Sequence, residues 1–312
     1  MEAHLRHPKT QVLWIAMAVG IAAVASASVL IRMAEAPALV IAAYRVGLAA
    51  LALGPLLLKR RPPSTLRISK GALQTTMISG ILLAIHFACW IQSLKMTTIA
   101  SSVTLVSTTP VFASLLSRLC LGEDFDRWTL AGVACSVIGG AWVAGSDFAV
   151  SGDAFWGDLL AVGGAAAAAG YLVTGRSARG CLDLTTYAFS AYGTAAAILI
   201  LFSAAAGLPL LGFPTRTYLI LAILALVPQL IGHTTFNWAL RFLSPTVVAV
   251  VLMGEPIGAS LLGYLVFGEI PSWKKAAGLT VLGMGIVLCS LSARDGTGRR
   301  RAGTREEPLA EG

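Results

Sequence analysis

Apolar residues follow one another in runs of about 20 along most of the chain, and short polar connections separate the runs. A run of this length predicts a helix that crosses a bilayer, because about 20 apolar residues span its hydrocarbon core. A membrane barrel would instead show segments of about 10 residues with alternating polarity. Ten membrane-spanning helices are therefore predicted. They cover residues 11–31, 37–58, 71–94, 100–121, 128–145, 156–175, 185–206, 218–240, 246–267 and 274–292.

The predicted helices divide the chain into two units with short flanking segments. The divisions are an N-terminal tail at 1–10, a first five-helix unit at 11–146, a linker at 147–155, a second five-helix unit at 156–292 and a C-terminal tail at 293–312. The C-terminal tail is rich in Arg, Gly and Glu, a composition that predicts disorder. The first apolar run is longer than the core of a signal peptide and similar runs follow it, so we expect it to remain as a helix.

The two units share a repeated stretch. Pro110 is followed by Gly-Glu at 122–123, and the same pattern returns as Pro256 followed by Gly-Glu at 268–269, with 146 residues between equivalent positions. A constant offset of this kind indicates a duplicated unit. Because each unit has an odd number of helices, the second must enter the membrane from the opposite side. The fold class expected is thus an all-α integral membrane protein with two inverted five-helix repeats, an arrangement typical of alternating-access transporters.

Composition agrees with a membrane protein and narrows its chemistry. Hydrophobic residues make up 56% of the chain and charged residues 12%, with a mean hydropathy of +0.79, whereas soluble domains carry about 25% charged residues. The five cysteines have no paired spacing, so no disulfide framework and no metal site is predicted. No phosphate-binding loop of the form G-x-x-x-x-G-K-[ST] is present. We therefore expect no cofactor, and this chain alone is not expected to be an ATP-driven pump.

Basic residues are distributed unequally between the two sides of the predicted bundle. If both termini are cytoplasmic, 17 of the 23 Lys and Arg residues fall on the cytoplasmic side and five on the other side, while Arg45 lies inside a predicted helix. This bias follows the positive-inside rule and predicts both termini in the cytoplasm. The net charge of +8 is accounted for by this topology and by contact with anionic lipid. No nucleic acid partner is predicted.

Polar residues within the predicted helices are the first candidates for a substrate path, because a polar group that faces lipid is costly. Gln229, His233 and Asn237 are spaced by four residues and share one face of the helix at 218–240. His86 and Trp90 have the same spacing in the helix at 71–94. The alternative is that such groups bind neighbouring helices as part of the packing. For the stripe at 218–240, a cavity is the favoured interpretation.

Hydroxyl and aromatic side chains extend this set of candidates. Thr104 and Thr108 lie in the helix at 100–121, and Tyr171 lies in the helix at 156–175. The hydroxyls could bind an ammonium or carboxylate group, and the aromatic ring could pack against a side chain or a cation. Alternatively, Ser and Thr can bind the backbone of their own helix. The predicted substrate-binding residues are His86, Trp90, Thr104, Thr108, Tyr171, Gln229, His233 and Asn237.

Glu255 and the two repeated prolines are candidates for coupling or gating. Glu255 precedes Pro256 inside an apolar run, and an unpaired carboxylate in such a place tends to take up a proton, as a proton-coupled exporter requires. The structural alternative is that Glu255 binds backbone groups left free by Pro256. Pro110 and Pro256 are expected to bend their helices, which could serve gating.

These features resemble a known family. The ten-helix plan, Pro37 with Arg45 at the start of the second helix, and the Pro to Gly-Glu pattern at the end of each half resemble the EamA family of the drug/metabolite transporter superfamily. The resemblance covers residues 11–292, although the position equivalent to Arg45 is Ala191. Among its members the chain is most similar to bacterial exporters of aromatic and neutral amino acids. The resemblance implies a secondary transporter of the inner membrane that is not an enzyme and acts as a monomer.

Other functions remain open. An intramembrane enzyme would need a His, Asp or Cys cluster with metal-ligand or nucleophile spacing, and no such spacing is found in the sequence. A receptor would usually carry a soluble signalling domain, which the sequence does not show. Within transport, the alternative is an exporter of cationic drugs, which requires Glu255 to face the cavity. We expect the repeated residues to be scaffold. The chemistry is expected where the copies differ, at Thr109 against Glu255 and at Phe87 against His233.

Overall fold

The computed structural model describes residues 8–59, 69–97, 99–145, 152–267 and 272–303. Within them all regular structure is helical. The first half contains α1 (Thr10–Ala25), α2 (Ala27–Met33), α3 (Ala38–Lys59), α4 (Lys70–Met96), α5 (Ile99–Val106), α6 (Thr109–Leu121) and α7 (Arg127–Gly145). The second half contains α8 (Gly152–Cys181), α9 (Leu184–Ala205), α10 (Thr215–Leu224), the π-helix η1 (Ala225–His233), α11 (Thr234–Ala239), α12 (Pro245–Leu252), α13 (Glu255–Phe267) and α14 (Trp273–Gly303).

Every predicted apolar segment forms helix, but some segments are interrupted. The first segment is divided at Ser26, the segment at 100–121 after Val106, and the segment at 246–267 after Leu252. Between α10 and α11 the chain becomes a π-helix. Among the described residues, six helices are long and apolar enough to cross a membrane. The number of ten spanning helices therefore stays a prediction. With these six helices the chain is a multi-pass membrane protein.

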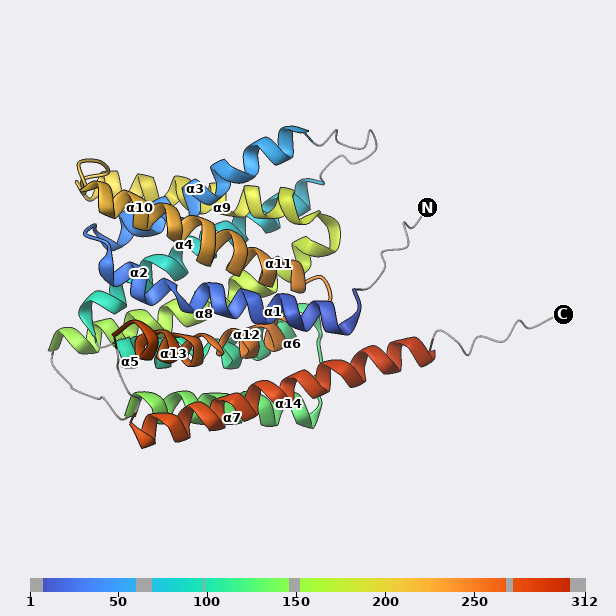
Figure 1. Cartoon of the computed structure of the whole chain (residues 1–312). Helices are drawn as coiled ribbons and strands as arrows, with labels where there is room; N and C mark the ends of the chain where they lie inside the picture. The colour runs from blue at the N-terminus through green and yellow to red at the C-terminus, as the bar shows by residue number, and fades with distance from the viewer. Residues whose placement is uncertain (1–7, 60–68, 98, 146–151, 268–271, 304–312) are drawn as a thin grey trace.

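Helix packing follows a two-fold pattern between the halves. The helix α4 lies along α8, and the equivalent pair is η1 against α1. The contact of α6 with α8 likewise corresponds to that of α13 with α1. The equivalent helices α3 and α9 pack against each other, as do α7 and α14. In Figure 1, α1 begins and α14 ends at the same end of the bundle, whereas α7 ends and α8 begins at the opposite end. The two halves thus run through the bundle in opposite directions.

Glycine residues allow α7 and α14 to pack closely against each other. A Cβ atom added at Gly132 would lie 2.6 Å from the sulfur of Cys289 and 2.8 Å from the carbonyl oxygen of Gly285. Contacts this short leave no room for a side chain, so the two helix backbones approach each other directly. Small residues at such a crossing are the usual means of close packing between membrane helices.

Two segments differ from their predicted state. The helix α14 continues to Gly303, so residues 293–303, which were expected to be disordered, are helical. Extending an existing helix is far easier than starting one, and this segment contains no proline. The helix α8 begins at Gly152, inside the predicted linker, and Asp153 in its first turn is favoured there by the helix dipole.

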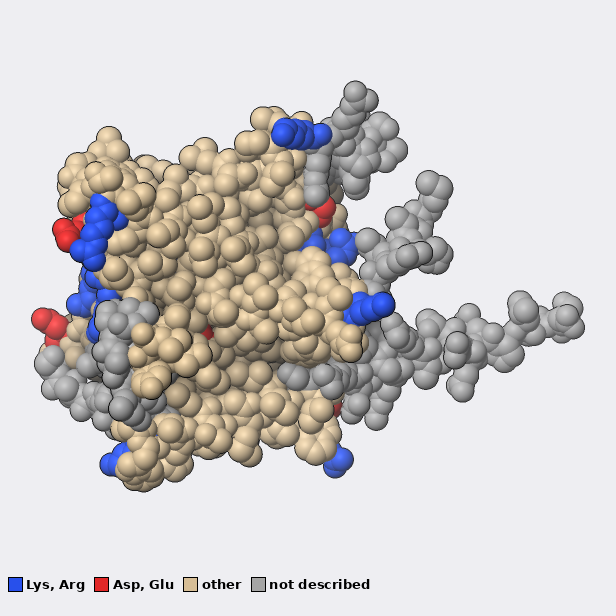
Figure 2. All heavy atoms as spheres, in the orientation of Figure 1, with Lys and Arg blue, Asp and Glu red and all other residues tan. Residues whose placement is uncertain are grey.

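The surface of the bundle has an uncharged belt. Figure 2 shows Lys, Arg, Asp and Glu gathered at the two ends, with few charged side chains between them. Large apolar side chains such as Leu51 on α3 and Leu201 on α9 are exposed on the outside of the helices. Apolar exposure of this extent is typical of a surface that contacts lipid.

Candidate functional site

A central cavity lies between the two halves of the bundle. Its empty volume is about 810 Å³, including the part that is open to the outside. The lining residues are Val24, Ala27, Arg45, His86, Trp90, Val103, Val106, Ser107, Thr109, Ala168, Tyr171, Leu172, His233, Phe236, Ala249, Leu252, Met253, Glu255 and Pro256. Most of these side chains are apolar, and a small number of polar groups converge among them. Apolar walls with a few convergent polar groups are the usual composition of a site for a small organic molecule.

Helix breaks at equivalent positions of the two repeats border this cavity. The chain leaves α5 at Ser107 and enters α6 at Thr109, and 146 residues later it leaves α12 at Met253 and enters α13 at Glu255. All four residues line the cavity. The prolines that follow lack a backbone N–H and therefore fit the first turn of a new helix. Interrupted helices in corresponding positions of two inverted repeats commonly form transporter binding sites.

The two repeated prolines differ in their position relative to the cavity. Pro256 lines the cavity, whereas Pro110 is buried at the start of α6 and is not among the lining residues. The predicted part of both prolines in gating stays a prediction. A break in a helix exposes backbone and opens space beside it, which is why the repeated stretch and the cavity lie close together at Pro256.

Arg45 on α3 is buried in the membrane-spanning part of the bundle and faces the cavity. Its side chain is 0% exposed, and its Nε donates a hydrogen bond of 2.9 Å to Oε1 of Gln229. The guanidinium carbon lies 4.3 Å from the ring centroid of Phe87 and 5.9 Å from that of Trp90. Both terminal nitrogens are buried without a hydrogen-bond partner. An arginine stays charged in proteins, so these N–H groups are a strong, unused donor pair.

Glu255 supplies a second unpaired group in the same cavity. It is the first residue of α13, and its Oε1 is buried without a hydrogen-bond partner. The predicted alternative, that this carboxylate binds backbone groups freed by Pro256, is not seen for this oxygen. Arg45 and Glu255 form no ion pair with each other, although both line the cavity.

Aromatic and imidazole rings form one wall of the cavity. The rings of His86 and Trp90 are parallel within 5°, with centroids 5.9 Å apart. The Nδ1 atom of His86 lies 2.9 Å from the carbonyl oxygen of Gly164, and because a carbonyl only accepts, Nδ1 carries the proton. His233 meets Phe87 edge to face at 5.3 Å. His86, Trp90 and His233 thus line the cavity, and their binding of a substrate stays a prediction.

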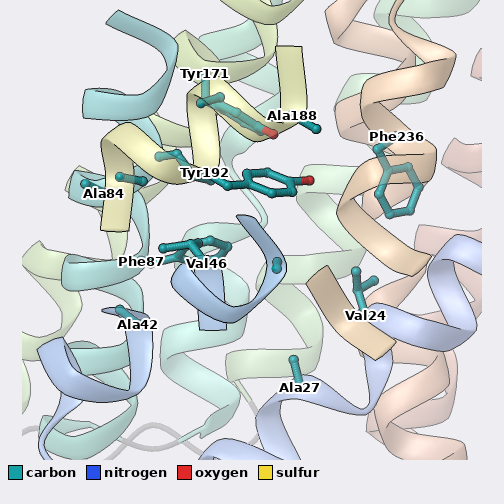
Figure 3. Packing of buried hydrophobic residues seen from close by; sticks show 14 of the residues in the cluster. Val24, Ala27, Ala42, Val46, Ala84, Phe87, Tyr171, Ala188, Tyr192 and Phe236 are labelled. Atoms are coloured by element: carbon teal, nitrogen blue, oxygen red, sulfur yellow. The ribbon is translucent and has the colours of Figure 1, made fainter. Parts of the chain in front are cut away.

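The predicted stripe of Gln229, His233 and Asn237 is divided by the structure. Only His233 lines the cavity, while Gln229 and Asn237 are 0% exposed and lie behind it. Asn237 accepts a hydrogen bond of 2.7 Å from the hydroxyl of Tyr171 and donates one of 3.0 Å to that of Tyr192. In Figure 3 the hydroxyls of these two tyrosines point toward the helix that carries Phe236. Gln229 and Asn237 therefore position Arg45 and Tyr171 instead of facing the cavity themselves.

The π-helix explains part of this arrangement. Pro228 lies inside η1, where it removes one backbone donor and prevents the regular α-helical bond. Segments of π-helix inside longer helices occur frequently at functional sites. The same segment carries both Gln229 and His233.

The remaining predicted residues have different placements. Tyr171 lines the cavity. Thr108 donates to the carbonyl oxygen of Leu105 at 2.6 Å and is not among the lining residues, so it follows the packing alternative. The side chain of Thr104 lies outside the described part of the structure. Among the described residues, no group of three or more His, Cys, Asp or Glu could hold a metal ion.

Arg45 is the residue that the sequence analysis missed as a site candidate. The signal was present, because an ionisable residue inside a membrane-spanning segment is by default a functional hypothesis. Thr109 and Glu255, predicted from the differences between the repeats, both line the cavity, and Phe87 lies against Arg45.

Comparisons with known proteins agree with this architecture. The profile of the EamA-like transporter family matches residues 9–145 and again residues 155–291. Solved structures match in 29 chains. One of them, described only as the crystal structure of a protein, has 18% sequence identity and a TM-score of 0.75, and the match covers 92% of this chain and 99% of that one. At this identity the likeness concerns the fold. Among curated proteins, none matches the chain at a significant level.

Proposed function

The chain belongs to the EamA-like transporter family, and from this premise we propose that it is a secondary transporter that exports amino acids across the bacterial inner membrane. Aromatic and neutral amino acids, such as threonine and methionine, are the proposed substrates. The observation that carries this proposal is the central cavity, in which unpaired N–H groups of Arg45 and an unpaired oxygen of Glu255 face mostly apolar walls. Amino acids carry the complementary charges and a side chain for the apolar surface.

Alternating access is the proposed mechanism. The cavity lies between two repeats that run in opposite directions, and its walls include a helix break from each repeat. If the two repeats exchange conformations, the opening moves from one face of the membrane to the other. We also propose that the transporter works as a monomer.

Purified protein in liposomes provides the test. The vesicles are loaded with an unlabelled amino acid, and labelled threonine, methionine or phenylalanine is added outside. We expect the label to accumulate by exchange faster than in vesicles without protein. If no amino acid in the panel exchanges faster than in the empty vesicles, the proposed function is wrong.

Export of cationic drugs is the second candidate, and one observation favours it. Glu255 faces the cavity together with Trp90, Tyr171 and Phe236, and an acid among aromatic rings can hold an organic cation. The charge of Arg45 in the same cavity opposes a cation. Exchange of a labelled aromatic cation in the same vesicles, faster than that of every amino acid, would favour the drug exporter.

A further inference from the structure

We propose that the cavity selects zwitterions: Arg45 binds the carboxylate of the substrate and Glu255 binds its ammonium group, so that a molecule with only one of these charges is rejected. This inference rests on the proposed function and specifies the substrate class of the same site. It assigns a separate role to each of the two ionisable residues.

The geometry of Arg45 suits a carboxylate. Nε is occupied by Gln229, and the ring of Phe87 covers one face of the guanidinium group. The two terminal nitrogens remain, both buried and both without a hydrogen-bond partner. These nitrogens present parallel N–H groups, which bind the two oxygens of one carboxylate in a bidentate manner. The side chain is therefore held in place before the substrate arrives, which lowers the entropy lost on binding.

Glu255 offers the complementary group. Its Oε1 has no partner and faces the same cavity. Its place at the first residue of α13 puts the carboxylate where the helix dipole favours a negative charge. An ammonium group has three donors and no acceptor, so it can bind this oxygen and still reach a nearby hydroxyl. Tyr171 and Thr109 belong to the same lining. Their hydroxyls donate to Asn237 and to the carbonyl oxygen of Val106, so toward an ammonium group they act as acceptors.

The two charges together explain why a zwitterion is preferred. Arg45 is buried, Glu255 is half-buried with a buried Oε1, and the two form no hydrogen bond with each other through this oxygen or the terminal nitrogens of Arg45. A buried charge without a partner is unfavourable, so a substrate that binds only one of them leaves the second uncompensated. A zwitterion neutralises both and adds no net charge to the cavity. The loss of one of its charges should weaken binding at least about 10-fold, as is usual when a buried charged partner is left unsatisfied.

The rest of the cavity indicates the kind of side chain. The lining includes apolar residues from both halves of the bundle. They are Val24 and Ala27 from the first half, and Phe236, Ala249 and Leu252 from the second half. Apart from Arg45 and Glu255, no described lining residue is a Lys, Arg, Asp or Glu. A charged side chain on the substrate would therefore lack a partner. The substrate class is an α-amino acid with an apolar or aromatic side chain.

Competition by analogues tests this inference on the unchanged protein. The vesicles exchange the amino acid with the fastest flux in the panel, and unlabelled competitors share its side chain. For phenylalanine these are phenylalanine itself, phenethylamine, which lacks the carboxylate, and 3-phenylpropionate, which lacks the ammonium group. We expect both analogues to compete at least about 10-fold more weakly than phenylalanine. If either analogue competes as well as the amino acid, the inference is overturned while the transport of amino acids stands. If no amino acid is exchanged at all, the proposed function fails and the inference fails with it.

Two variants assign the charges to their residues. Arg45→Gln should lose the preference for phenylalanine over phenethylamine, and Glu255→Gln should lose the preference over 3-phenylpropionate. Each preference is a ratio within one preparation, so it does not depend on the yield of folded protein. Arg118→Gln and Glu35→Gln are matched controls, because both side chains are exposed away from the cavity, and they should keep both preferences. A variant at Arg45 or Glu255 that keeps the original ratios contradicts the assignment. If either variant fails to fold, the analogue competition on the unchanged protein still decides.

Discussion

The guanidinium group of Arg45 is fixed on one nitrogen by Gln229 and on one face by Phe87. Its position depends on residues from three different helices, α3, η1 and α4. A side chain with this much support has a single orientation, and its two unpaired nitrogens are thereby directed at the cavity. In the proposed mechanism Gln229 therefore positions the side chain of Arg45, and Arg45 contacts the substrate.

Replacing Gln229 tests that distinction. In Gln229→Met the volume is nearly kept but the hydrogen bond to Nε is lost, and a bond to a charged group contributes about 1.5–3 kcal/mol. We expect the KM for the transported amino acid to rise about 10-fold or more, since 1.4 kcal/mol corresponds to a factor of ten. The measurement is the concentration dependence of exchange in liposomes.

The matched control for this variant is Thr235→Val. Thr235 lies on the neighbouring α11, and its hydroxyl donates to the carbonyl oxygen of Ile231 in the last turn of η1. Its KM should stay within about two-fold of the original value, because the side chain is not among the cavity residues. Equal KM changes in the two variants would show that Gln229 does not act through Arg45.

Glu255 is also the candidate for proton coupling. An ammonium group and a proton would compete for the same carboxylate, and such competition is a direct way to exchange one for the other. Arg45, His86, Tyr171 and His233 are the other ionisable residues that line this cavity. We expect an inward proton gradient to accelerate efflux by the unchanged protein and to have no effect in Glu255→Gln. A gradient effect that persists in the variant would remove Glu255 from the coupling.

The residues that line the cavity could be predicted only in part from the sequence. His86, Trp90, Tyr171, His233 and Glu255 could be identified because polar or aromatic groups inside apolar segments need a reason to be there. The buried positions of Gln229 and Asn237 could not be predicted in the same way. Their roles depend on how η1 and α11 are rotated against α3 and α9, and that rotation is decided by tertiary contacts.

The interrupted helices connect the fold to the cavity at the scale of elements. The breaks between α5 and α6 and between α12 and α13 lie at equivalent positions of the repeats, so each half contributes one broken helix to the lining. Bends of this kind leave space within the bundle that continuous helices would fill. The closely packed pair α7 and α14 lies against the broken helices, where Gly140 on α7 lies next to Ser107 and Met253 at the two breaks.

A methyl group at this crossing should destabilise the protein. In Gly132→Ala the new Cβ would meet the sulfur of Cys289 and the backbone of Gly285, and overpacking of this type costs about 1–3 kcal/mol. We expect a lower midpoint of thermal unfolding in detergent. The control is Gly163→Ala on α8, where nothing lies within 4 Å of the added atom, and it should not lower the midpoint. Similar midpoints for both variants would contradict the close crossing.

The positions of the helices could be predicted from the sequence more fully than the residues of the cavity. Apolar run length predicted most helix bounds within a few residues, because the thickness of the bilayer sets the length of its helices. It did not predict the π-helix η1, whose hydrogen bonds depend on Pro228 and on the contact with α1. The apolar run also predicted an end at residue 292 for the last helix, whereas α14 continues to Gly303. Apolar residues mark only the part of a helix that lies in the membrane.

The whole molecule is a pair of repeats from the EamA-like transporter family that run in opposite directions through one bundle. The repeat at a fixed offset of 146 residues could be read from the sequence, and the odd helix number then predicts the inversion. The orientation in the membrane rests on the distribution of Lys and Arg alone. Labelling of cysteines from either side of the membrane provides an independent check of this orientation.

Two native cysteines allow that check. Cys120 near the end of α6 and Cys181 at the end of α8 are exposed, and both are predicted to lie on the cytoplasmic side. In variants that keep only one of them, a membrane-impermeant maleimide should label inside-out vesicles and leave right-side-out vesicles unlabelled. A variant that keeps only Cys289, which is buried, is the negative control. Labelling from the outer side would reverse the predicted orientation.

The central claim is that amino acids are transported through the cavity and are held there by Arg45. Exchange of labelled phenylalanine into liposomes, compared between the unchanged protein and Arg45→Gln at equal amounts of folded protein, tests it most directly. We expect accumulation of label with the unchanged protein and a rate at least about 10-fold lower with the variant, because the carboxylate loses its charged partner. Equal rates of exchange for the two proteins would contradict it.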